Sequence, residues 1–93
     1  MTIAESTPDT ASDVVVIDRV TTASGTVYEF RWDDPDDVEA WPRPGMVRKN
    51  GGPWIGIGLI TRGFDLNTRM FWIREDDSTV HTSAIALVEA VLA

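Results

Sequence analysis

The stretch VVVIDRVTTASGTVYEFRW, residues 14–32, predicts a β-hairpin. Its first part is β-branched, and its last part alternates two sets of side chains, as a half-buried strand does. The set that shares one face of the second strand is Thr26, Tyr28, Phe30 and Trp32. TTASG, between the two parts, ends in Gly25 and has the composition of a turn. We therefore expect a hairpin whose second strand carries its large side chains on one face.

Further short strands are predicted, separated by turn-forming segments. They are MVRK (46–49), WIGIGLIT (54–61), RMFWIR (69–74) and TVHT (79–82). Gly56 and Gly58 share one face of the WIGIGLIT strand, so we expect another part of the chain to cross that face closely. The last segment, SAIALVEAVLA (83–93), fits either a helix capped by Ser83 or one turn and a final strand; we favour the helix.

The segment WDDPDDVEAWP, residues 32–42, concentrates acidic residues between two tryptophans. Asp34 is placed to cap a short helix that starts at Pro35 and ends before Pro42. A calcium loop of the EF-hand type would need glycine at its sixth place and glutamate at its twelfth, where this chain has Val38 and Pro44. We therefore expect a short acidic helix here and no metal site.

These elements together predict a mainly β (α+β) fold. We expect a small barrel or curled antiparallel sheet of five to six strands, with an N-terminal hairpin, a short acidic helix and a possible C-terminal helix. Residues 1–12 are polar and read as a disordered tail, so that residues 13–93 form a single small domain. No apolar run is long enough to span a membrane and no basic leader precedes one, which predicts a cytoplasmic protein.

The chain carries a net charge of −7 in three blocks, acidic up to residue 41, basic over 42–74 and acidic again to the end. Two interpretations are open. The blocks can meet across the folded domain as weak surface pairs, or they can form a bipolar surface that steers a charged partner.

Signals for catalysis are close to absent. The chain has no cysteine and a single histidine, His81, so neither a thiolate nor a two-histidine metal site can form. Gly56 and Gly58 lack the third glycine of a dinucleotide-binding fingerprint and lie inside a strand. We expect no enzyme activity and no cofactor.

The order of segments over residues 44–91 resembles the SH3-like small barrels, as in Mind-bomb-type and KOW-type modules. The likeness rests on PGMVRK (44–49), GPWIG (52–56), the aromatic strand RMFWIR with the acidic turn after it, and the closing stretch SAIALVEAV (83–91). This resemblance implies a small barrel that binds peptides or nucleic acid without catalysis, and the fold alone does not choose between the two.

One functional alternative is nucleic-acid binding through the RMFWIR strand, where arginines lie beside aromatic residues, as on a surface that stacks nucleobases. The residues concerned are Arg69, Phe71, Trp72 and Arg74. The net charge of −7 argues against this reading, because it repels phosphates.

The preferred reading is protein recognition, because tryptophan and arginine dominate interface hot spots. The candidate partner-binding residues are Asp36, Asp37, Glu39, Trp41 and Arg43. The length, acidity and arginine-rich usage resemble, in style, the small non-structural accessory proteins of actinobacteriophages, which bind and modulate or inhibit a host protein. The expected partner is a host protein, helical or coiled-coil, with a basic surface. A structural or virion component is a third class, and self-association through an unpaired barrel edge such as the first strand is open.

Overall fold

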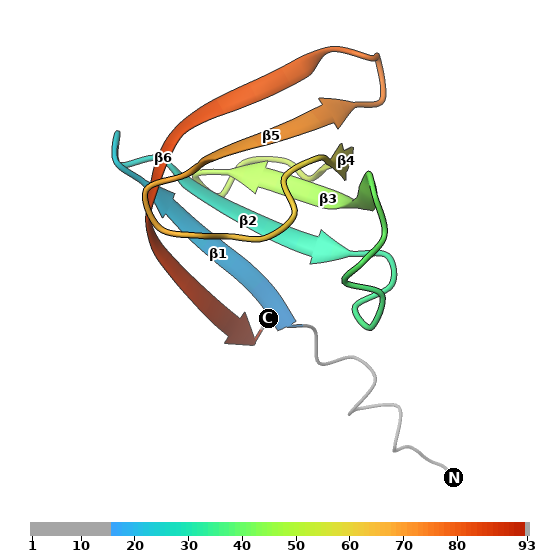
Figure 1. Ribbon diagram of the computed structural model, residues 1–93, viewed down its shortest axis with the longest axis horizontal. Helices are drawn as coiled ribbons and strands as arrows, with labels where there is room; N and C mark the ends of the chain where they lie inside the picture. The colour runs from blue at the N-terminus through green and yellow to red at the C-terminus, as the bar shows by residue number, and fades with distance from the viewer. Residues whose placement is uncertain (1–15, 93) are drawn as a thin grey trace, which may run out of the picture.

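The computed structural model describes residues 16–92, which form a closed antiparallel β-barrel (Figure 1). Its strands are β1 (Val16–Thr22), β2 (Val27–Trp32), β3 (Arg43–Lys49), β4 (Ile55–Leu59), β5 (Arg69–Arg74) and β6 (Thr79–Leu92). Each strand pairs with the next along the chain, and β6 closes the barrel against β1. The prediction of a small antiparallel barrel is thus confirmed, while the predicted tail, residues 1–12, lies outside the described residues.

The predicted hairpin of β1 and β2 is present, with Val20 opposite Tyr28. Gly25 in its turn has a φ of 87°, a left-handed conformation that glycine adopts without a steric penalty. Phe30 of β2 is fully buried, and Tyr28 and Trp32 pack against the core beside it. The alternation in the sequence therefore identified the inward face of β2.

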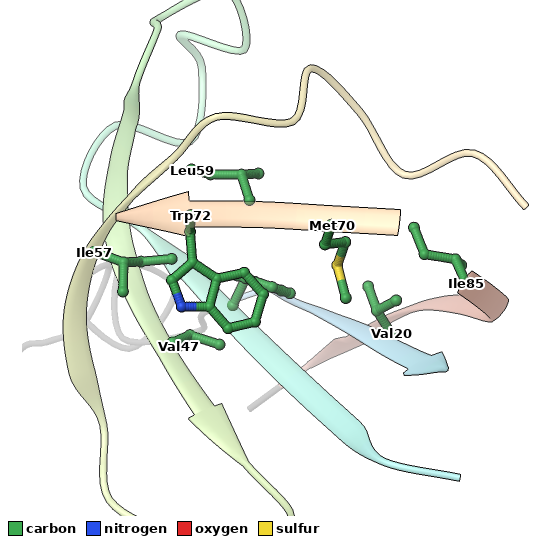
Figure 2. Close-up of a cluster of buried hydrophobic side chains, with 8 residues drawn as sticks. Val20, Val47, Ile57, Leu59, Met70, Trp72 and Ile85 are labelled. Atoms are coloured by element: carbon green, nitrogen blue, oxygen red, sulfur yellow. The ribbon is translucent and has the colours of Figure 1, made fainter. Parts of the chain in front are cut away.

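The barrel interior holds one apolar cluster contributed by all six strands. Its buried members are Val20, Phe30, Val47, Ile57, Leu59, Met70, Trp72 and Ile85. Figure 2 shows Met70 and Trp72 extending from β5 into the barrel, toward Val20 and Val47 respectively. The Trp72 ring meets Phe30 edge-on, with 5.6 Å between ring centroids. Such edge-to-face contacts add to the free energy gained from burying apolar area, which makes this ring pair a centre of the core.

The prediction that something crosses the glycine face of β4 is confirmed. A Cβ atom on Gly58 would lie 3.0 Å from the Cβ of Pro42, and one on Gly56 would collide with the carboxylate of Glu75. The two glycines therefore let the chain pass close to the outer surface of β4 at two places.

Both predicted helices are wrong, because residues 16–92 contain no helix. The acidic segment, residues 33–42, forms turns between β2 and β3. Helices shorter than roughly 12–15 residues are marginal unless they pack on a core, and Val38, an apolar side chain of this segment, is exposed. Residues 83–92 continue β6, and Val88 and Val91 pair with residues of β1. Pairing with β1 outweighs the modest helix propensity of the alanines in this segment.

The long strand β6 is shared by two neighbours. Its first part pairs with β5 as far as Ala84, and its second part pairs with β1 from Ile85 to Leu92. The loop between β4 and β5, residues 60–68, runs across the front of the barrel in Figure 1. Phe64 of this loop packs on Phe30, with ring centroids 5.2 Å apart, so the loop closes over the core.

A row of charges crosses the outer surface of the barrel. Glu29 of β2 is only 6% exposed and accepts hydrogen bonds from Arg19 of β1, at 3.1 and 3.2 Å, and from Arg48 of β3, at 2.6 Å. The hydrogen bond from Arg48 holds the pKa of Glu29 below the ordinary glutamate value; burial opposes this shift, and Arg19 reinforces it. A buried carboxylate is thereby compensated on both sides by the neighbouring strands.

Candidate functional site

The acidic loop, residues 33–42, is a series of tight turns tied to the start of β3. The Oδ1 of Asp34 accepts a hydrogen bond from the backbone N–H of Asp36 at 3.1 Å, and Asp37 N–H donates to the Asp34 carbonyl at 3.2 Å. Asp34 thus performs the capping that the sequence predicted, but on a turn rather than a helix. Asp36 and Asp37 are both exposed.

Trp41, near the end of the acidic loop, is exposed and yet anchored. The residue is 54% exposed, while its indole Nε1 donates a 2.8 Å hydrogen bond to the carbonyl of Ile60. The guanidinium of Arg62 lies over the same ring, 5.5 Å from its centroid. Ile60 and Arg62 belong to the β4–β5 loop, so Trp41 ties the two loops together.

Arg43, at the start of β3, lies beneath the acidic loop. Its guanidinium stacks over Trp32 at 4.1 Å from the ring centroid, and its Nη2 donates to the carbonyl of Pro35 at 3.4 Å. Its buried Nε has no hydrogen-bond partner among the described residues. Trp32 in turn donates from Nε1 to the carboxylate of Asp18 at 2.7 Å. The indole of Trp32 thus contacts both the guanidinium of Arg43 and the carboxylate of Asp18 at this end of the barrel.

A cleft of about 220 Å³ separates the acidic loop from the β4–β5 loop. Its walls carry apolar side chains, Val38 and Phe64, and charges of both signs, including Glu39, Arg43 and Arg62. Its volume is below the roughly 300–1,000 Å³ of pockets that enclose small molecules and cofactors. The cleft therefore has room for about one amino-acid side chain.

Of the five predicted partner-binding residues, Glu39 and Arg43 line this cleft. Trp41 does not line it, but the ring of Trp41 lies under Arg62, which does. Asp36 and Asp37 lie on the same loop, as exposed residues. The sequence analysis did not identify two residues that line the cleft, Val38 and Arg62. Val38 is 63% exposed and stands alone between acids in the sequence, a weak signal of an exposed apolar contact.

The alternative set on β5 is divided between the two faces of the strand. Trp72 is 3% exposed and belongs to the core. Phe71 points outward and stacks on His81, with centroids 4.3 Å apart. Arg69 and Arg74 are exposed at the two ends of β5. The aromatic pair that a stacking platform would need is therefore not on one surface.

Charge pairing in the described part of the chain is confined to Glu29, whose partners Arg19 and Arg48 form the two ion pairs found there. The carboxylates of the acidic loop form none within residues 16–92. Within residues 16–92 the charge blocks thus meet around Glu29 and not as a general network of surface pairs.

Within residues 16–92 no cluster of three or more potential metal ligands is found. The same residues include no helix long and apolar enough to cross a membrane. Comparison of the chain with protein-family models, with curated proteins and with solved structures finds no match.

Proposed function

We propose that this protein is a non-enzymatic binding module, of the kind that phages direct against a host, and that it binds and modulates a host protein through the acidic loop. The observation that carries the proposal is Trp41, a large aromatic side chain that is more than half exposed but held in one orientation. Tryptophan is the residue type most enriched in interface hot spots.

Anchoring matters because binding costs less free energy when side chains are ordered beforehand. The hydrogen bond to Ile60 and the guanidinium of Arg62 fix Trp41 without covering its ring fully. Val38 offers a second exposed apolar contact on the same loop, and the cleft beside it can accept a side chain of the partner. An aromatic anchor next to a small cleft is a typical hot-spot arrangement.

The carboxylates of the loop, which form no ion pair with residues 16–92, favour a partner with a basic surface. Asp36 and Asp37 are exposed on the same loop as Trp41, so they would attract positive charge and raise the rate of association. A helical or coiled-coil host protein with lysine or arginine next to an apolar stripe fits this surface. The protein would then act in the cytoplasm of the host cell.

The likeness of residues 44–91 to SH3-like barrels supports a binding role, since those modules recognise peptides or nucleic acid without catalysis. The nucleic-acid alternative is the weaker one, because Trp72 lies in the core and cannot stack on a nucleobase. Of the two aromatic residues of β5, Phe71 alone lies on the outer side. The net charge of −7 also opposes binding to phosphates.

The proposal is tested by affinity capture from an actinobacterial lysate treated with nuclease, followed by affinity measurement with the captured protein. Trp41→Ala should weaken binding about thirtyfold, the loss of a hot spot worth about 2 kcal/mol. Adding Asp36→Lys should abolish capture. Trp54→Ala is the matched control, since Trp54 is a surface tryptophan covered by Arg31 and Arg48 away from the loop, and it should bind normally.

Thermal unfolding of the same variants separates binding from folding. Trp41→Ala should cost about 1 kcal/mol of stability, because it removes one hydrogen bond from a half-exposed side chain. Full capture by the double variant, or capture that disappears with nuclease, would refute the proposal. An unfolded Trp41→Ala variant would place Trp41 among the structural residues instead.

A further inference from the structure

The second half of β6, residues 86–92, has a neighbouring strand on one side only within the described part of the chain. β1 pairs with it throughout, whereas β5 leaves β6 at Ala84. On that second side, the β4–β5 loop pairs with Ile85, whose N–H donates to Thr68 O at 2.7 Å and whose carbonyl accepts from Asn67 N at 2.8 Å. In Figure 1 this half of β6, the dark red arrow, runs along the margin of the barrel with β1 beside it. By contrast, β1, which the sequence suggested as an edge, is paired on both sides.

This edge has few of the features that keep strands from pairing. Leu87, Val88 and Leu92 are 49%, 37% and 70% exposed, and Glu89 is the one charge in the segment ALVEAVL. The segment contains no proline and no lysine, which commonly protect exposed edges. A strand edge of this length and composition is a template for another strand.

We propose that residues 88–92 of two copies of this chain pair antiparallel across a twofold axis and join the two barrels into a dimer. The sequence of the edge is self-complementary in one register. Side chains paired across antiparallel strands lie on the same face, so Ala90 can face Ala90 of the second copy. Val88 then faces Leu92 of the second copy, and the reverse pair forms on the other side of the axis.

This register also separates the acidic side chains. With Ala90 on the axis, Glu89 faces Val91 of the second copy, whereas an axis through Glu89 would place two carboxylates opposite each other, which is destabilising. The apolar side chains of Val88 and Leu92 leave water together. The edge of a second copy therefore matches this edge in its apolar side chains. Because the same residues meet on both copies, the contact is isologous and closes as a dimer.

The dimer and the capture of a host protein should respond to salt in opposite directions. Each chain carries −7, so two copies repel each other and salt strengthens the dimer by screening. Binding of a basic partner to the acidic loop is weakened by salt for the same reason. Failure of one proposal can therefore be distinguished from failure of the other.

The oligomeric state of the full chain should be measured by light scattering and sedimentation over a range of concentrations. We expect twice the mass of one chain, with tighter association at higher salt. Val88→Lys combined with Leu92→Lys should give a monomer with unchanged circular dichroism. Leu66→Lys, a change of the same type at a 59% exposed leucine of the β4–β5 loop, should remain a dimer.

The register is tested with single cysteines, because the chain has none of its own. Ala90→Cys should form a disulfide-linked dimer on mild oxidation, since facing Cα atoms of antiparallel strands lie about 4.5–5.5 Å apart, within disulfide range. Glu89→Cys should remain largely unlinked. A monomer at every concentration overturns the proposal, as does equal crosslinking at the two positions. If the chain is a monomer and Val88→Lys abolishes capture of the host protein, the edge instead pairs with a strand of the host protein.

Discussion

Replacing Glu29 by glutamine should destabilise the barrel by about 2 kcal/mol at neutral pH. Glu29 accepts three hydrogen bonds from two guanidiniums, and hydrogen bonds to charged groups contribute about 1.5–3 kcal/mol each. Two effects reduce the sum: the side chains of Arg19 and Arg48 are 38% and 31% exposed, so water screens them, and glutamine keeps one acceptor oxygen. A loss of about 2 kcal/mol corresponds to a fall of about 8–16 °C in the melting temperature of a domain of this size.

The same substitution should remove part of the pH dependence of stability. Because Arg48 and Arg19 lower the pKa of Glu29 in the folded protein, the carboxylate stabilises the fold fully above its unfolded pKa of about 4.3. This contribution is lost as the pH falls through the lower, folded pKa. The stability gap between wild type and Glu29→Gln should therefore be constant from pH 7 to about pH 5 and shrink in stronger acid.

Urea unfolding followed by tryptophan fluorescence, at neutral and acidic pH, measures both effects. Glu75→Gln is the matched control, because Glu75 is exposed and forms no ion pair within the described residues, and it should change stability by less than about 0.5 kcal/mol. A loss below about 0.5 kcal/mol for Glu29→Gln, or a gap that does not narrow in acid, would refute the role assigned to the Glu29 row.

Three further substitutions test the packing of the barrel. Gly45→Ala should cost more than about 2 kcal/mol, because the new Cβ would lie 2.5 Å from the carbonyl oxygen of Arg31, a backbone atom that cannot move aside; Gly56→Ala should cost less, since it meets the end of a flexible side chain. Comparable urea midpoints for these two variants would contradict this reading. Phe64→Ala should cost about 1.5 kcal/mol, because its half-buried ring packs on Phe30, and it should speed hydrogen exchange in the β4–β5 loop. Unchanged stability and exchange would show that the loop does not depend on this contact.

The sequence was most informative where side chains alternate. Tyr28 and Phe30 mark the inner face of β2, and the glycines of β4 mark a close approach, because a strand has a strict two-residue period that neighbouring strands cannot alter. On β5 the same alternation separated Phe71 from Trp72, but the sequence did not say which of them entered the core. That choice depends on which face of the sheet curls inward.

The sequence was misleading where local propensity and long-range pairing disagree. Asp34 is a good helix cap, and the alanines near the end of the chain favour a helix, but neither segment is helical. The acidic segment must connect two adjacent strands, and residues 83–92 satisfy their backbone by pairing with β1. Energies from such long-range hydrogen-bond ladders exceed the few tenths of a kcal/mol that separate helix propensities.

The sequence by itself determined that the chain forms short strands separated by turns, with an acidic segment between Trp32 and Trp41. Only the tertiary structure decided that Trp41 lies at the surface beside Arg62, that Trp72 is buried, and that the second half of β6 has one neighbouring strand among residues 16–92. The physical reason is that period and turn chemistry are properties of neighbouring residues. Exposure and edge formation depend instead on how six strands close around one core, which brings together residues that are far apart in the chain.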